Sequence, residues 1–151
     1  MLKNTIITFL ISMVPVIELR GALPYGVVCG LPVGLAFAIS VLGNLIPAPF
    51  IIIYARRLIQ WMKTKSGTVK RFADWLERKA ERNKEKVLKY EFWGLMILVA
   101  IPLPGTGAWT GSLVAAMLDM RLKRAMPAIA IGVIIAGIIV SLMTAGVIVL
   151  T

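Results

Sequence analysis

"VPVIELRGALP", residues 14–24, places two charged side chains, Glu18 and Arg20, inside a segment that is otherwise apolar. Residues 4–17 before the pair and residues 21–55 after it carry mostly hydrophobic side chains and no charge. Ionisable groups in such an apolar setting are energetically expensive, and they usually mark functional positions with a defined partner. The pair is therefore a candidate functional site, and the prolines and the glycine around it predict a break in regular helix.

The composition is that of an integral membrane protein. Of 151 residues, 59% are hydrophobic, against about half in a soluble domain, and the mean hydropathy is +0.88. The net charge of +10 is concentrated, because 12 of the 17 Lys and Arg residues fall within residues 56–91 and three more within 121–124. Basic loops of this kind are typical of the cytoplasmic side of a membrane protein. No nucleic-acid-binding motif accompanies them, so we expect no nucleic-acid partner.

Several kinds of chemistry lack their usual residues. The chain has no His and a single cysteine, Cys29, so an intrachain disulfide is excluded and a metal site is not expected. No glycine-rich phosphate loop ending in Lys-Ser or Lys-Thr occurs, and no nucleophile–base set is visible. We therefore expect neither a cofactor nor an enzyme activity.

The first half of the chain predicts a helical hairpin followed by a membrane span. The apolar run before Glu18 would reach only about 21 Å as a helix, whereas the hydrocarbon core is about 30 Å thick. We therefore predict that residues 4–30 form a re-entrant hairpin, which enters and leaves the membrane on one side, with its tip between Pro15 and Pro24. Residues 33–55 then form a transmembrane helix, kinked by Pro47 and Pro49.

The second half repeats this plan. Residues 92–118 carry no charge, but "IPLPGTGAWTG" at 101–111 interrupts them with prolines, which remove backbone donors, and with flexible glycines. We predict a second re-entrant hairpin here, then a polar turn, then a transmembrane helix over 125–150.

The positive-inside rule gives the two halves opposite orientations. With 56–91 and 121–124 in the cytoplasm, the hairpin of 4–30 enters from outside, the second hairpin enters from inside, and both termini lie outside. The expected fold is an all-α integral protein of the plasma membrane with two inverted repeats, each a re-entrant hairpin followed by a span. The single membrane domain, 1–151, thus comprises repeat one (4–55), a cytoplasmic linker (56–91) and repeat two (92–150).

The linker is predicted to form an amphipathic helix. Its apolar positions lie at helical spacing, and Asp74 with Arg78 and Glu85 with Lys89 form possible i,i+4 pairs; the apolar residues are Phe72, Trp75, Leu76, Ala80 and Val87. Such a helix would lie on anionic lipid, or it would bind a partner protein.

Broken hairpins inside a membrane must face protein or a wet cavity, because hydrocarbon does not tolerate unpaired backbone groups. Half-helix N-termini at such a cavity would favour an anion, Arg20 would add a donor fork, and Glu18 could carry a proton. The candidate substrate and proton site comprises Glu18, Arg20, Gly21, Pro15, Pro24, Pro102, Pro104, Gly105, Thr106, Gly107, Trp109, Thr110 and Gly111.

Structural roles for these residues remain open. Glu18 and Arg20 could form a static ion pair, or each could cap a hairpin end, and the glycines could serve close packing. Asn44, in the first predicted span, is a possible secondary site residue or an interhelical hydrogen-bond donor.

"PVIELRGALPYG" followed later by "PLPGTGAWTG" resembles the small multidrug export protein family, which is distantly similar to the DedA superfamily of membrane proteins. The resemblance extends over essentially the whole chain. It implies two inverted re-entrant hairpins, proton-linked transport, and relatives that translocate lipid phosphates such as undecaprenyl phosphate. Glu18 then matches the acidic position and Arg20 the basic position of the first hairpin. DedA proteins carry further charges in the second hairpin, where this chain has Pro, Gly and Thr.

The expected function is a proton-coupled secondary transporter of an anionic lipid, such as a polyprenyl phosphate or a phospholipid. One alternative is efflux of cationic or amphipathic drugs, with Glu18 as the counter-charge. Another is a non-transporting membrane scaffold that docks partners on the linker. Since two spans and two hairpins make a thin wall, we also expect a homodimer among the membrane lipids.

Overall fold

The computed structural model of the chain is all-helical, and no strand occurs among the residues that it describes. It describes residues 1–64, 67–68, 70–72, 74–75, 78 and 84–150, with the backbone alone for 84–89. Two helical stretches are long and apolar enough to cross a membrane: Val33–Lys63, with 31 residues, and Leu122–Leu150, with 29. The predicted fold class is confirmed at this level, while the re-entrant course and the inverted repeat remain predictions.

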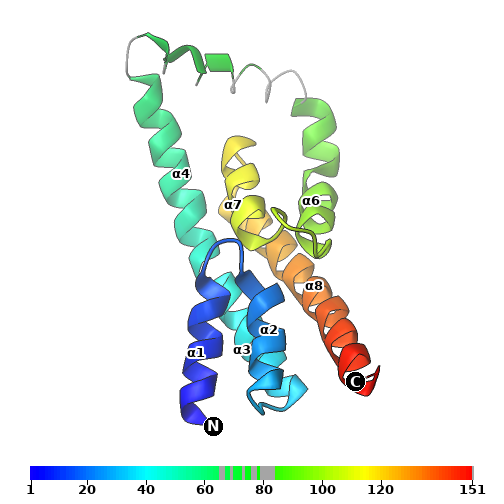
Figure 1. The fold of residues 1–151 in the computed structure, drawn as a ribbon. Helices are drawn as coiled ribbons and strands as arrows, with labels where there is room; N and C mark the ends of the chain where they lie inside the picture. The colour runs from blue at the N-terminus through cyan, green and yellow to red at the C-terminus, as the bar shows by residue number, and fades with distance from the viewer. Residues whose placement is uncertain (65–66, 69, 73, 76–77, 79–83, 151) are drawn as a thin grey trace.

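The first half forms a hairpin of two short helices, α1 (Leu2–Met13) and α2 (Glu18–Val28), joined by a tight bend at 14–17 (Figure 1). The bend is shorter than the predicted tip between Pro15 and Pro24, because α2 already begins at Glu18. Pro24 lies inside α2, where its missing N–H removes one intrahelical hydrogen bond without ending the helix.

The long stretch after this hairpin is divided into α3 (Val33–Leu45) and α4 (Pro47–Lys63) by a break at Ile46. Pro47 occupies the first turn of α4, a position where a missing N–H is tolerated. The predicted kink is therefore present. The helix itself continues to Lys63, beyond the predicted end at residue 55.

In the second half, α6 (Lys84–Ala100) leads through an irregular loop at 101–107 into α7 (Ala108–Met117). A turn then leads into α8 (Leu122–Leu150), which tolerates Pro127 within it. The loop is shorter than the predicted interruption at 101–111, so Trp109, Thr110 and Gly111 belong to the first turns of α7. The helix α6 also starts earlier than the predicted boundary at 92.

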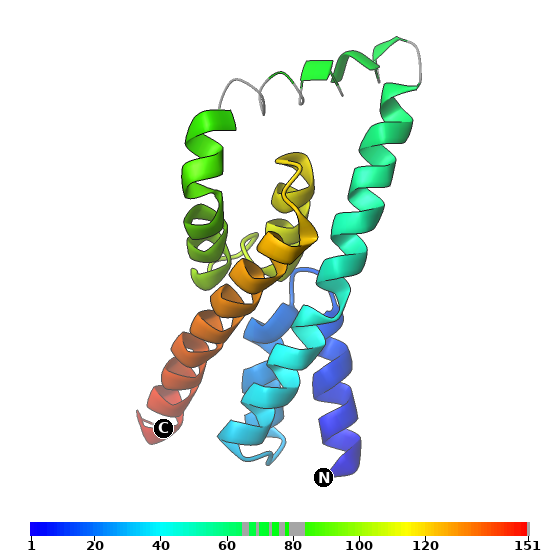
Figure 2. The ribbon, with the colours of Figure 1, turned by 180° about the vertical axis from the view of Figure 1, so that it is seen from behind.

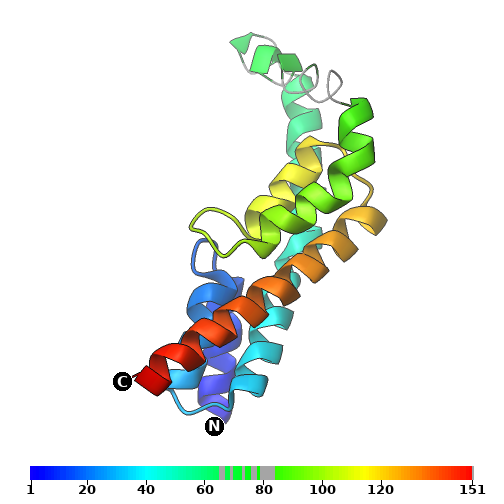
Figure 3. The same cartoon turned by 90° about the vertical axis from the view of Figure 1, so that its right-hand side faces the viewer.

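The two hairpins approach each other from opposite ends of the molecule. In Figure 1 both termini lie at one end, whereas the end of α4 and the start of α6 lie at the other. The hairpin α1–α2 rises from the first end and α6–α7 descends from the second, so that their bends meet in the middle. The view from behind in Figure 2 and the side view in Figure 3 show the same meeting of the two bends.

Glycines bring the helices into close contact around this meeting point. A Cβ on Gly43 of α3 would collide with Ser12 and come within 2.8 Å of the Phe9 carbonyl oxygen of α1. A Cβ on Gly132 of α8 would lie 2.8 Å from the Met96 carbonyl oxygen of α6. Small residues at such contacts allow the backbones of membrane helices to pack closely.

Part of the predicted linker helix lies within the described residues. The rings of Phe72 and Trp75 stack with centroids 6.1 Å apart, and both side chains are exposed. Arg78 Nε donates a hydrogen bond of 3.4 Å to the backbone carbonyl of Asp74. The other predicted positions lie outside the described residues or have undescribed side chains; these are Leu76, Ala80, Glu85, Val87 and Lys89.

Candidate functional site

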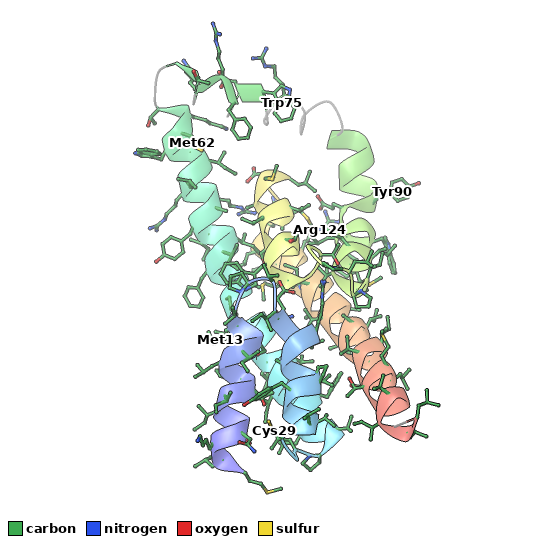
Figure 4. The ribbon with its side chains drawn as sticks, viewed as in Figure 1. Met13, Cys29, Met62, Trp75, Tyr90 and Arg124 are labelled. Atoms are coloured by element: carbon green, nitrogen blue, oxygen red, sulfur yellow. The ribbon has the colours of Figure 1, made fainter. Side chains whose placement is uncertain are left out.

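Among the described residues, three hydrogen bonds join the two hairpins where their bends meet. The backbone N–H of Trp109 donates to Glu18 Oε1 at 3.1 Å, and its indole Nε1–H donates to the Met13 carbonyl at 3.2 Å. Arg20 Nη2 donates to Thr106 Oγ1 at 3.1 Å. In Figure 4, Met13 lies at the bend end of α1, and Cys29 lies at the opposite end of the same hairpin. The hydrogen bonds between the bends join residues about 90 positions apart in the chain.

Glu18 caps the N-terminus of α7 from the other hairpin. The residue before α7 is Gly107, which has no side chain that could cap the helix. The Glu18 carboxylate accepts a hydrogen bond from the backbone N–H of Trp109, in the first turn of α7, instead. Only 5% of Glu18 is exposed, so the negative charge meets the positive end of the helix dipole largely out of water. This end of α7 is thus an anion-binding position that is filled by a carboxylate of the chain itself.

Gly107 makes this approach possible. Its φ of 146° and ψ of −166° belong to a region that is essentially restricted to glycine. A Cβ at this position would overlap the Glu18 carboxylate and would lie 3.1 Å from Arg20 Nη2. Both the backbone conformation and the space in front of it therefore require glycine.

Arg20 binds a hydroxyl that also organises the loop of the second hairpin. Thr106 Oγ1 lies 2.6 Å from the Ile101 carbonyl oxygen and 2.9 Å from the Leu103 carbonyl oxygen, and its single hydrogen serves one of them at a time. It accepts a hydrogen bond from the Leu103 N–H at 3.3 Å in addition to the bond from Arg20. Arg20 is only half buried, and this bond uses one of its five donors, so a planar donor fork remains for an anion.

Glu18 and Arg20 each bind a different group of the second hairpin. They still influence each other electrostatically. Of the structural alternatives, the geometry favours the cap for Glu18, although on the opposite hairpin rather than on its own.

The bend that presents Glu18 has unusual backbone geometry. Val16 has a φ of 78° and Glu18 a φ of 48°, conformations that are uncommon for residues other than glycine and least favourable for a β-branched side chain. Strain of this kind persists only where the surrounding structure imposes it, often at functional sites. Sequence reasoning did not single out Val16, because a valine between a proline and an isoleucine carries no signal for a positive φ.

The structure brings together five of the predicted site residues: Glu18, Arg20, Thr106, Gly107 and Trp109. Three more lie in the loop beside them, Pro102, Pro104 and Gly105, and Thr110 Oγ1 donates to the Gly105 carbonyl at 2.8 Å. Pro15 is exposed in the bend of the first hairpin.

The remaining predicted residues serve packing or lie apart. A Cβ on Gly21 would collide with Ile17 of the preceding turn, and one on Gly111 would collide with Val99 of α6. Pro24 lies about 9 Å along α2 from Glu18. Asn44 is buried near the end of α3, and no residue of the described chain is bonded to its Oδ1.

Comparison with known proteins identifies one family. The family model with the description "Putative small multi-drug export protein" matches residues 18–139, well over half of the chain. This match begins at Glu18 and includes α2, α7 and the loop between α6 and α7, so it contains both charged residues of the site and their partners. No curated protein and no solved structure matches the chain.

Proposed function

Because the chain belongs to the small multi-drug export family, we propose that this membrane protein is a proton-coupled secondary transporter of an anionic lipid. The observation that carries the proposal is the N-terminus of α7, where the Glu18 carboxylate accepts a hydrogen bond from the backbone N–H of Trp109 beside the Arg20 guanidinium. A carboxylate and a phosphate monoester or diester need the same recognition chemistry, namely convergent donors and positive potential. A polyprenyl phosphate or a phospholipid would fit this position.

The proposed cycle exchanges one anion for another at α7. When Glu18 takes up a proton it loses its charge, and its hydrogen bond from the Trp109 N–H weakens. The lipid phosphate then binds the N–H groups at the start of α7 together with the free donors of Arg20. Loss of the proton restores the carboxylate, which displaces the phosphate. Proton uptake and substrate binding are thereby linked at a single helix terminus.

The membrane arrangement we propose has two re-entrant hairpins that enter from opposite faces as inverted repeats. The arms α1, α2 and α7 have 12, 11 and 10 residues, so each reaches only about 15–18 Å into a core about 30 Å thick. Their bends would therefore meet near the midplane, the usual place for a transporter's substrate site. A homodimer in the plasma membrane would supply the remaining wall around the site.

Cysteine labelling tests this arrangement. In a Cys29→Ala background, single cysteines at Leu2 and Leu150 are expected to react with an impermeant maleimide from outside the cell. A cysteine at Thr68 is expected to react only after the membrane is opened, because the basic linker should be cytoplasmic. Labelling of Leu2 and Leu150 from opposite faces would rule out the inverted arrangement, since it requires an odd number of crossings.

Arg20→Gln separates lipid-phosphate transport from efflux of cationic drugs, the alternative that the family description favours. If Arg20 binds the head group, the variant loses a charged hydrogen bond of about 1.5–3 kcal/mol, and the transport rate at low substrate falls roughly 10- to 150-fold. Arg20→Lys should restore it only in part, because a point charge replaces a planar fork. The measurement is flipping of a fluorescent lipid phosphate in proteoliposomes.

Arg57→Gln is the matched control, because it removes the same charge from an exposed position on α4. It should transport at the normal rate. Removal of the positive charge at Arg20 should leave drug export unchanged or improved if the substrate is a cation. Normal lipid transport by Arg20→Gln would contradict our proposal. Absence of both lipid transport and drug export in the unmodified protein would also contradict it, and is the result expected for a scaffold.

A further inference from the structure

Trp109 of the second hairpin binds both ends of the bend in the first hairpin. Its backbone N–H donates to Glu18 Oε1 at 3.1 Å, and its indole Nε1–H donates to the Met13 carbonyl oxygen at 3.2 Å. Met13, which Figure 4 labels, is the last residue of α1, and Glu18 is the first residue of α2, with the exposed bend 14–17 between them. One residue in the first turn of α7 therefore contacts both arms of the opposite hairpin.

The two hairpins cap each other's helices. The last carbonyls of an α-helix have no partner within that helix, and α1 is followed by the extended residue Val14 rather than by a left-handed cap. The indole of Trp109 supplies a donor to the last of these carbonyls, that of Met13. In the same way, the Glu18 carboxylate supplies an acceptor to the start of α7. Hydrocarbon does not tolerate unpaired backbone groups, so the indole bond matters more inside a membrane than it would in water.

The described hydrogen bonds between the bends respond differently to a proton or to a substrate. Protonation of Glu18 removes the charge that strengthens its bond from the Trp109 N–H. Arg20, which is bonded to Thr106, is the side chain whose donors the proposed cycle gives to the phosphate. An indole N–H only donates, and neither it nor a backbone carbonyl changes charge. The indole bond is therefore the contact for which neither the proton nor the substrate competes.

We propose that Trp109 is a positioning residue that holds the start of α7 against the first hairpin while Glu18 is uncharged. Its two hydrogen bonds act as parallel attachments. When Glu18 is ionised, both of them hold α7 at the bend. When Glu18 is protonated, the indole bond remains, so the N–H groups of α7 stay beside Arg20, where the phosphate binds. This inference rests on the proposed function, because it concerns the step of that cycle in which Glu18 is neutral.

Trp109→Phe is expected to change the apparent affinity for the lipid phosphate but not the maximal transport rate. Without the indole bond, α7 leaves the bend in a fraction of the molecules in which Glu18 is neutral. The substrate binds only the remaining molecules, so its half-saturating concentration rises in proportion, and a saturating concentration restores the full rate. One neutral hydrogen bond corresponds to a rise of roughly two- to tenfold. The measurement is the substrate dependence of transport in proteoliposomes.

Distances between spin labels test the attachment itself without any substrate. In a Cys29→Ala background, labelled cysteines replace Leu10 of α1 and Leu113 of α7, which are both exposed. Glu18→Gln represents the neutral carboxyl, and Trp109→Phe keeps a ring without its donor. Each variant alone should keep the label distance of the unmodified protein, because the other bond of Trp109 remains. The combination should give a longer and broader distance distribution.

Trp93→Phe is the matched control, because it makes the same change at an exposed position on α6. It should leave the label distance and the substrate dependence of transport unchanged, both alone and together with Glu18→Gln. If Phe packs poorly at position 109, 3-benzothienylalanine gives the same test, since it keeps the shape of Trp and replaces the N–H group with sulfur.

An unchanged label distance in the combined variant would overturn the role of the indole bond. Separation of the labels in Trp109→Phe alone would overturn it as well, because Glu18 would then be unable to hold α7 by itself. A fall in the maximal rate without a rise in the half-saturating concentration would also contradict it. Absence of lipid-phosphate transport in the unmodified protein would defeat the proposed function, whereas the label distances would still decide the role of Trp109.

Discussion

Glu18→Gln is expected to reduce pH-gradient-driven transport to the background of protein-free vesicles while the protein remains folded. Gln keeps the size of the side chain and one acceptor oxygen for the Trp109 N–H. It carries neither a negative charge nor a removable proton, so it holds the site permanently in a neutral state. The measurements are uptake of a lipid phosphate driven by an imposed pH gradient and the melting temperature in detergent.

The size of the stability change separates a proton carrier from a static ion pair. Losing the charge at the N-terminus of α7 should cost about 0.3–2 kcal/mol, since a neutral amide still caps the helix in part. Removing one partner of a fully buried ion pair would cost about 3–5 kcal/mol. Because Arg20 is partly exposed and bonded to Thr106, we expect the smaller loss.

Glu91→Gln provides the control for Glu18→Gln. Glu91 is the other buried carboxylate with a described environment, and its Oε1 lies 2.8 Å from Arg124 Nη1 near the middle of α6, about nine residues before the loop of the second hairpin. This variant should lose stability without losing proton coupling. A Glu18→Gln protein that is stable and still fully coupled would show that Glu18 neither carries the proton nor holds the hairpins together.

Gly107→Ala is expected to have the largest effect on the contact between the hairpins. The added methyl group must adopt a glycine-only backbone conformation, which costs about 1–3 kcal/mol. It must also displace the Glu18 carboxylate, and overpacking of this kind costs about 1–3 kcal/mol more. The sum is a large share of a typical stability of about 5–15 kcal/mol, so the melting temperature should drop sharply.

Gly105→Ala is the control that measures the conformational cost alone, so that the difference from Gly107→Ala gives the steric cost. Gly105 has a φ of 83° in the same loop, but no described atom lies within 4 Å of an added Cβ. It should therefore lose only the conformational share. Combining Gly107→Ala with Glu18→Ala removes the collision, and the double variant should be more stable than the sum of the two single losses predicts. Strict additivity would mean that Gly107 and Glu18 do not interact.

The family and the helical, membrane-spanning character of the protein could be predicted from the sequence, because they depend on properties of local segments. The apolar runs set helix length, and the prolines and glycines of 101–111 mark where backbone donors are lost. The charged pair Glu18 and Arg20 stands out against its apolar surroundings in the same way. The resemblance to the small multi-drug export family is confirmed by the match over 18–139.

The exact limits of the hairpin bends depended on tertiary structure. Pro24 looked like the end of the first bend, but it lies within α2, since a helix in a packed bundle tolerates one missing hydrogen bond. The positive φ of Val16 has no sequence signal, because a β-branched residue does not favour that conformation and adopts it only where the surrounding structure imposes it.

The partners of the charged pair were also decided by tertiary structure alone. From the sequence, a static ion pair between Glu18 and Arg20 was one of the open alternatives, yet each of the two binds the second hairpin about 90 residues away. Local sequence determines where helices begin and which side chains can carry charge. A helix terminus becomes a binding position only when another segment reaches it, and here the close approach at Gly107 lets the Glu18 carboxylate reach α7.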